Sequence, residues 1–200
     1  MGVSMVKKGL RQLKREQTLE RITDIALTLF LEKGFDKVTI DEIVAQAQVS
    51  RQSFFDYFGS KENVVYAWQL KFGDALTEAF AGCPLGEPIR RTAERAMIRC
   101  ILSTTNEQSL AIAKLIMATP ALRDREQLLL LKLEDVLTTA LMARYPEIEA
   151  LEVQIVAMAT IGAFRVGCII RNGAPVLPIA EASIARVFRK LWREDGTIGS

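Results

Sequence analysis

Residues 39–62 decide how this chain is expected to fold, and they read TIDEIVAQAQVSRQSFFDYFGSKE. Thr39 and Glu42 have the spacing of a capping box, in which each side chain bonds the other residue's backbone N–H, so a helix should begin at Ile40. The apolar residues of this helix recur at helical spacing and are Ile40, Ile43, Val44 and Ala47. A helix of about eight residues is unstable alone in water. It must therefore pack against neighbouring helices.

A second short helix should follow a break at residues 48–50. Ser50 can cap a helix over residues 51–58, in which Phe54 and Phe58 lie about one turn apart on the same face. We expect that face to point into the core, which leaves the other side of the helix to solvent.

A longer helix should precede this pair. Apolar residues between Ile22 and Phe30 follow the i, i+3, i+4 rule and predict a helix over about residues 10–33, which Gly34 would end. Three helices, of which the last two are joined by a tight turn, form a helix-turn-helix unit.

The rest of the chain has the same helical periodicity. Ser60 should cap a fourth helix that ends near Phe80, and a loop rich in glycine and proline follows at residues 81–88. Further helices are predicted over about residues 88–104, 107–119, 121–144, 147–171 and 178–195. The chain is therefore predicted to be all-α, with about nine helices. We expect an N-terminal domain over residues 1–60, a linking fourth helix over 60–80 and a second domain over 81–200.

The composition excludes several classes of protein. Half of the residues are hydrophobic and a quarter are charged, as in ordinary globular proteins. Three cysteines without a Cys-x-x-Cys pair, and no histidine, argue against a zinc site and a disulfide framework. We therefore expect no metal, no cofactor and no enzymatic activity. The apolar stretch from Val153 to Ile170 contains Arg165, which would be costly inside a bilayer, so we expect a buried helix and a cytoplasmic protein without membrane contact.

The N-terminal end of the helix over residues 51–58 carries side chains that can read DNA. Arg51 can donate two hydrogen bonds to guanine O6 and N7, and Gln52 can pair with adenine N6 and N7. Thr39 and Ser50 begin helices, where backbone N–H groups and the helix dipole favour a phosphate. Each of these residues alone would be an ordinary cap or a solvated side chain. The prediction of a DNA-binding surface rests on their placement around one turn.

This segment resembles the signature of the tetracycline-repressor (TetR) family. Members typically read T-h-x-x-I-A-x-x-A-G-V-S-x-x-T-h-Y-x-Y/H-F-x-S-K-E, where h is apolar. The chain matches this pattern at Val49–Ser50, at the aromatic-x-x-Phe that ends with Phe58, and at Ser60–Lys61–Glu62. The resemblance extends upstream through Phe30–Phe35 and covers about residues 18–68. It implies a DNA-binding domain of three helices, a linking helix, and a larger domain for ligand binding and dimerisation.

Carried over position by position, the resemblance implies a set of DNA contacts. The residues that would contact phosphates are Thr39, Ser50, Tyr57 and Lys61, and those that would approach base edges or phosphates are Arg51, Gln52 and Ser53. Two further positions of this surface depart from the family pattern. Gln48 replaces the usual glycine of the turn and would hold a left-handed conformation at some cost. Phe55 stands where tyrosine is common, which removes a hydroxyl that could bond a phosphate.

Five basic residues and no acidic residue precede Glu16 in the sequence, and they are Lys7, Lys8, Arg11, Lys14 and Arg15. One interpretation is a solvated, mobile tail without a function. The other is an arm that follows phosphates or the minor groove, which would add affinity that falls with salt.

The second domain has no recognisable catalytic set, and TetR-family members sense small ligands among its central helices. The candidate lining for a small apolar effector consists of Met97, Ile101, Leu115, Met117, Leu133 and Phe164, with Arg99 or Arg165 as a polar anchor. Apolar residues at helical spacing also fill ordinary cores. The same residues are therefore alternatively plain core.

Two predicted helices fit a dimer interface. The helix over residues 147–171 carries small residues that would let another helix approach closely: Ala157, Ala159, Gly162, Ala163 and Gly167. The last helix has an apolar stripe made of Ile184, Val187, Phe188, Leu191 and Trp192. In the TetR family the two final helices of each subunit form a four-helix dimer interface, so the resemblance implies a homodimer. A two-fold dimer presents two recognition helices to DNA, so the operator should be palindromic.

Three functions follow as hypotheses. The first is a ligand-responsive transcriptional regulator, a repressor released from double-stranded DNA by a small-molecule effector. The second is a constitutive helix-turn-helix DNA-binding protein whose second domain senses nothing. The third is an all-helical enzyme or scaffold with an incidental helix-turn-helix. DNA binding separates the third hypothesis from the others, and ligand binding separates the first from the second.

Overall fold

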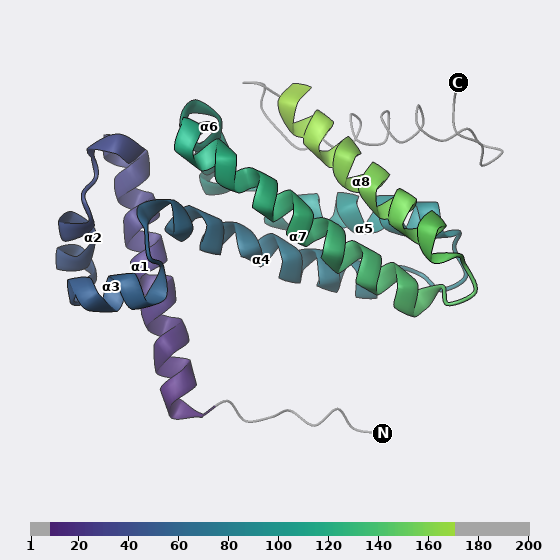
Figure 1. Ribbon diagram of the computed structural model, residues 1–200, viewed down its shortest axis with the longest axis horizontal. Helices are drawn as coiled ribbons and strands as arrows, with labels where there is room; N and C mark the ends of the chain where they lie inside the picture. The colour runs from purple at the N-terminus through teal and green to yellow at the C-terminus, as the bar shows by residue number, and fades with distance from the viewer. Residues whose placement is uncertain (1–8, 171–200) are drawn as a thin grey trace. The chain divides into compact units, whose positions relative to one another are not determined.

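The computed structural model of the chain describes residues 9–170 (Figure 1). Within this range the chain forms one 3₁₀ turn, no strand, and eight α-helices. These elements are α1 (Leu10–Lys33), η1 (Phe35–Lys37), α2 (Ile40–Ala47), α3 (Arg51–Tyr57), α4 (Lys61–Ala81), α5 (Ile89–Thr104), α6 (Glu107–Ala118), α7 (Pro120–Arg144) and α8 (Ala150–Ile170).

The all-α prediction is confirmed, and most predicted helix ends agree closely with the observed ones. The largest difference is at α8, which begins at Ala150 and not near residue 147. The Ile148 N–H donates to the Tyr145 carbonyl over 3.1 Å, so a turn occupies the residues around Pro146 before the helix begins. The helix predicted over residues 178–195 lies outside the described residues.

The chain divides into two compact units, and each is described by itself. Among the described residues, the first contains those up to Trp68 together with Ala111–Arg125, and the second contains Gln69–Leu110 and those from Glu126 to Ile170. The boundaries predicted from the sequence, near residues 60 and 81, differ from this division. Parts of α6 and α7 belong to the first unit because their apolar residues join its core.

The core of the first unit explains why two very short helices are stable. Phe54 of α3 is completely buried, and its ring centroid lies 5.5 Å from that of Phe58. The cluster that surrounds them includes residues of α1, α2, α4, α6 and α7: Ile22, Ala26, Leu27, Phe30, Ile43, Ala47, Val64, Val65, Ile112, Ile116 and Leu122. Since α2 and α3 each add buried residues to this shared cluster, packing offsets the cost of forming helices too short to persist alone.

The second unit has its own core, in which α5 packs against α8. A buried polar network closes one end of this unit. The Tyr145 hydroxyl donates to the Glu87 carbonyl over 2.8 Å and lies 2.5 Å from the Thr92 hydroxyl. The Arg144 guanidinium donates to the Phe80 carbonyl over 3.1 Å. These bonds connect the end of α7 and the adjacent Tyr145 to the last turn of α4, to the loop after it and to the first turn of α5.

The long apolar helix α8 raised the question of a membrane span. Between residues 9 and 170, no helix of the structure is both long and apolar enough to cross a bilayer, α8 included.

The ends of α2 and α3 follow the local sequence. Thr39 Oγ1 accepts the Glu42 N–H over 3.2 Å, and Glu42 Oε2 accepts the Thr39 N–H over 3.1 Å, so the predicted capping box is present. The Ser50 hydroxyl caps α3 by accepting the Ser53 N–H over 3.0 Å. Gln48 ends α2 at φ 51° and ψ 46°, which confirms the left-handed conformation expected there. Its N–H donates to the Ala45 carbonyl over 3.3 Å.

Replacing Gln48 with glycine should stabilise the protein. A left-handed conformation costs a non-glycine residue about 1–2 kcal/mol, part of which is offset by the entropy of glycine in the unfolded chain, so we expect Gln48→Gly to raise the free energy of unfolding by about 1 kcal/mol. The matched control is Gln46→Gly in the helical part of α2, which should lower it by about 1 kcal/mol. Urea unfolding followed by circular dichroism measures both. If the Gln48→Gly protein were no more stable than wild type, the left-handed conformation of Gln48 would not cost the expected free energy.

Candidate nucleic-acid interface

The outward side of α3 carries the residues predicted to contact DNA. Phe54 and Phe58 point into the core, as predicted, while Arg51, Gln52 and Phe55 are exposed and Ser53 is half-buried. Phe55 is a large apolar side chain that remains 40% exposed at this surface. Packing therefore holds α3 by one face and leaves its leading turn accessible.

The helix N-termini of the first unit are available to an anion. Thr39, Ser50 and Gln48 are all exposed, and the Ser50 and Ser53 hydroxyls lie 2.9 Å apart at the start of α3. The capping side chains satisfy some of the leading N–H groups, and the positive ends of the α2 and α3 dipoles face solvent at Thr39 and Ser50, whereas Gln48 lies at the C-terminal end of α2. This arrangement is chemically suited to a phosphate group.

A salt bridge fixes α1 to the start of α2. The Lys33 ammonium lies 2.7 Å from Glu42 Oε1. The Lys33 ammonium hydrogen bond holds the pKa of the Glu42 carboxyl below its ordinary value, and Glu42 in turn raises the pKa of Lys33. The carboxylate that completes the capping box therefore stays charged at neutral pH.

The two candidate base-reading side chains each bond a carboxylate. Arg51 Nη1 lies 2.8 and 3.1 Å from the two carboxylate oxygens of Asp41, and its guanidinium carbon is 5.8 Å from the centroid of the Phe55 ring. The Gln52 amide donates to Asp56 over 2.8 Å. The sequence analysis did not identify either carboxylate as part of this surface.

Lys61 and Tyr57 have structural partners as well as predicted phosphate contacts. The Lys61 ammonium donates to the carbonyls of Phe35 over 3.0 Å and Val38 over 2.7 Å. It also lies 4.6 Å from the centroid of the Phe35 ring. Because an ammonium has three donors, one N–H remains for a phosphate. The half-buried Tyr57 ring lies 5.7 Å from the Arg15 guanidinium carbon.

The basic N-terminal segment is partly helical. Arg11, Lys14 and Arg15 lie in the first turns of α1 and are exposed. These three residues are therefore solvated, as both interpretations require, and they are part of a helix. Lys7 and Lys8 lie outside the described residues.

The residues predicted to line an effector site are divided between the two units. Leu115 packs against the core of the first unit and Met117 is exposed there, whereas the other six belong to the second unit. Within the second unit Met97, Ile101 and Leu133 are buried. Phe164 is half-buried and Arg165 is exposed.

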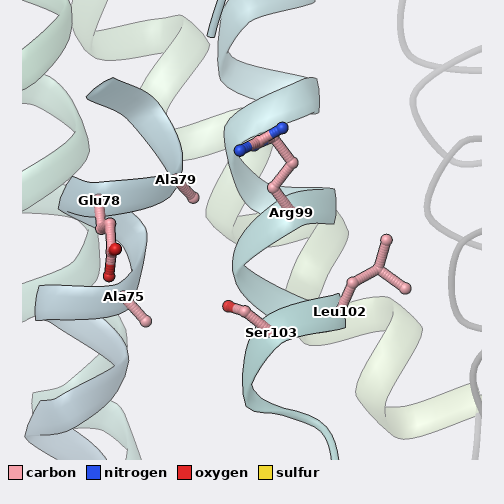
Figure 2. Close-up of a pocket in the computed structure, with 6 residues that line it drawn as sticks. All are labelled: Ala75, Glu78, Ala79, Arg99, Leu102 and Ser103. Carbon is pink, nitrogen blue, oxygen red and sulfur yellow. The ribbon is translucent and has the colours of Figure 1, made fainter. Parts of the chain in front are cut away.

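A hollow of about 460 Å³ lies between α4 and α5 of the second unit (Figure 2). Its lining consists of Ala75, Glu78, Ala79, Arg99, Leu102 and Ser103. Arg99 was predicted as a polar anchor, and it is the one predicted residue in this lining. Periodicity favours buried apolar positions, so it could not identify the exposed Glu78, Leu102 and Ser103.

The small residues predicted for a dimer interface differ in how far they are buried. Ala163 is buried within its own chain, Ala159 is half-buried, and the space beside Gly162 is open. The exposed apolar side of α8 consists of Leu151, Ile155, Met158 and Val166. The remaining predicted interface residues lie outside the described residues, namely Ile184, Phe188, Leu191 and Trp192.

The cysteines described by the structure are buried. Cys83 and Cys100 are both free thiols, and burial raises the pKa of Cys100 to about 12. Among residues 9–170, no three histidine, cysteine or acidic side chains are grouped so that they could hold a metal ion.

Comparison with known proteins identifies the N-terminal region. Residues 22–67 match the family model described as "Bacterial regulatory proteins, tetR family". The HTH-type transcriptional regulator TcmR of Streptomyces glaucescens is 34% identical over 79 residues, which are 40% of this chain. The aligned part spans only 35% of the length of TcmR.

Solved structures extend the likeness to most of the chain. NalD of Pseudomonas aeruginosa, the secondary repressor of the MexAB-OprM multidrug efflux pump, gives a TM-score of 0.61 at 22% identity, covering 90% of this chain and 99% of NalD. The TetR-family repressor AlkX of Dietzia sp. gives a TM-score of 0.56 at 18% identity, covering 85% of this chain and 92% of AlkX. At these identities the likeness concerns the fold.

Proposed function

We propose that this chain, whose residues 22–67 match the family model of the tetR family of bacterial regulatory proteins, is a regulator of that family and represses transcription. In this proposal a homodimer binds a palindromic operator and leaves it when a small effector binds. The structural neighbours NalD and AlkX are both described as repressors, which supports the direction of regulation.

The observation that carries the proposal is the leading turn of α3. Buried Phe54 and Phe58 anchor this helix, while Arg51 and Gln52 remain exposed at its N-terminal end. In helix-turn-helix proteins that end enters the major groove, where arginine pairs with guanine and glutamine with adenine. Exposed Ser50, at the start of the same helix, is positioned to donate its hydroxyl hydrogen to a neighbouring phosphate.

The exposed apolar side of α8 supports a homodimer. Leu151, Ile155 and Met158 are between 42% and 60% exposed, and together with Val166 they form one stripe along the helix. Beside this stripe, the open space at Gly162 allows a second helix to approach closely. Contiguous exposed apolar surface of this kind marks an interaction site, and a second copy of the chain is the occupant that a two-fold operator requires.

The second unit is the proposed place for a small, mainly apolar effector. The hollow between α4 and α5 combines apolar Ala75 and Leu102 with the charged groups of Glu78 and Arg99. An effector changes the affinity for DNA only if it binds the released form more tightly than the DNA-bound form.

One observation favours the alternative of a constitutive DNA-binding protein. Met97, Ile101 and Leu133 are 1%, 5% and 2% exposed, as expected of a filled core. A core that is already full leaves no interior space for a ligand, so the second unit would then serve dimerisation alone.

Removing Arg51 should reduce sequence preference. If Arg51 reads a guanine, Arg51→Ala should weaken binding to the operator by about 1–3 kcal/mol and binding to random duplex much less. Footprinting of the DNA upstream of the protein's own coding region would locate the operator, and fluorescence anisotropy would measure both affinities. The charge-matched control is Arg91→Ala on α5 of the second unit, which should change neither the affinity for the operator nor that for the random duplex. Equal losses on both duplexes would make Arg51 a phosphate contact.

A charge on the apolar stripe of α8 should separate the dimer. Burying an unpaired carboxylate in an interface costs several kcal/mol, so Met158→Glu should give a monomer. This monomer should bind a single half-site of the operator, and only weakly. Sedimentation equilibrium measures the assembly state. Gln108→Glu, in the first turn of α6, adds the same charge at an exposed position and should leave the dimer intact. A dimeric Met158→Glu protein would place the interface elsewhere.

A thermal-shift screen separates the effector hypothesis from the constitutive one. A ligand at one hundred times its Kd stabilises the folded state by about 2.7 kcal/mol and raises the melting temperature accordingly. An effector should do this and should also release the protein from the operator. The Arg51→Ala variant should show the same thermal shift, because the ligand binds the other unit. A screen in which ligands raise the melting temperature without releasing DNA would favour the constitutive hypothesis.

A further inference from the structure

The surface formed by α3 and the start of α2 places a carboxylate against each candidate base-reading side chain. Asp41 lies in the first turn of α2 and bonds Arg51 through both of its oxygens, at 2.8 and 3.1 Å. Asp56 lies one turn beyond Gln52 on α3 and accepts its amide at 2.8 Å. A negative charge on a surface that meets phosphates opposes binding. By their charge alone, these two carboxylates would lower the affinity for DNA. Any favourable contribution must come from the side chains whose positions they hold.

Stability does not account for the pair of Asp41 and Arg51. The two side chains are 70% and 60% exposed, and exposed ion pairs contribute little to the free energy of unfolding. A carboxylate in the first turn of α2 is favoured by the helix dipole. Glu42 in the same turn already supplies that charge and completes the capping box.

Asp41 uses only part of the hydrogen-bonding capacity of Arg51. A guanidinium has five N–H donors, and both contacts with Asp41 use Nη1, so Nη2 and Nε remain available for O6 and N7 of a guanine. The Phe55 ring contacts the same guanidinium at 5.8 Å. Contacts from α2 and α3 together restrict the side chain, so it loses less rotamer freedom when it binds a base.

We infer that Asp41 is a positioning residue that sets the sequence specificity of the proposed DNA binding, on which this inference rests. Asp41 orients Arg51 toward a guanine edge, and its charge cancels the attraction of Arg51 for phosphates. The weaker attraction to phosphates lowers the affinity for every duplex. The orientation of Arg51 raises the affinity only for a duplex that places a guanine at Arg51. The ligand is thus double-stranded DNA with a guanine at the position that Arg51 reaches in each half-site.

The test is a double-mutant cycle with Asp41→Asn, Arg51→Ala and the double variant. Affinities for the operator and for a random duplex are measured at several salt concentrations. The matched control is Asp36→Asn, which removes the same charge from an exposed aspartate of the same unit. All three substitutions are at exposed positions, and Glu42 keeps the capping box of α2, so the four variants should fold. Circular dichroism checks that they do.

Asp41→Asn should bind the random duplex more tightly, with a salt slope steeper by about one unit, because Arg51 becomes free to contact a phosphate. The ratio of operator affinity to random affinity should fall about tenfold. In the Arg51→Ala background the same substitution should leave that ratio unchanged, because the residue that Asp41 positions is gone. Asp36→Asn should raise both affinities equally.

Two results would overturn the inference. In the first, Asp41→Asn raises the affinities for the operator and for the random duplex by the same factor, as the removal of any surface carboxylate would. In the second, its effect on the ratio persists without Arg51. A wild-type protein that shows no salt-dependent binding to any duplex would instead overturn the proposed function, so the two failures are distinguishable.

Discussion

The shared core beneath α2 and α3 is the constraint on which the first unit depends. Helices of eight and seven residues have too few hydrogen bonds to repay nucleation in water. Ile43 and Phe54, both fully buried, attach these helices to the residues of α1 and α4. Burial of a single large apolar side chain contributes about 1.5–3 kcal/mol, so several buried residues together are needed to offset the cost of ordering such short helices. The buried core beneath α2 and α3 therefore sets the position of the exposed surface of these two helices.

Because packing holds one face of α3, the other face is free for charge and hydrogen bonding. The caps at Thr39 and Ser50 satisfy the local backbone, and Gln48 makes the turn between the helices at some conformational cost. None of these local devices uses Arg51 or Gln52. Their side chains instead bond carboxylates, so the surface is ordered before any ligand arrives.

Local features of this fold could be predicted from the sequence, whereas distant contacts could not. The capping box, the left-handed Gln48 and the inward Phe54 follow from spacings of a few residues, which secondary structure converts directly into geometry. The bonds from Lys61 to Phe35 and Val38 join residues more than twenty positions apart. No sequence pattern signals such a contact, because it depends on how the helices pack.

The same limit explains the mixed outcome in the second unit. Helical periodicity separates apolar from polar faces, but it does not say which neighbour an apolar face meets. Leu115 and Ala163 illustrate this point, since both sit at helical spacing. Leu115 packs in the first unit, and Ala163 is buried within its own chain. The exposed stripe of α8 became visible only once the buried side of that helix was known.

Ion pairing on the first unit also changes how its net charge is interpreted. The first 61 residues carry ten basic and eight acidic side chains, a small excess for a DNA-binding surface. Lys33 and Arg51 are already paired with carboxylates, and Lys61 is bound to two carbonyls. The basic side chains around the start of α3 are therefore already engaged, whereas Arg11, Lys14 and Arg15 remain exposed on α1. In the proposed DNA binding, unspecific attraction to phosphates would come from such exposed cations, and sequence discrimination from the ordered side chains of α3.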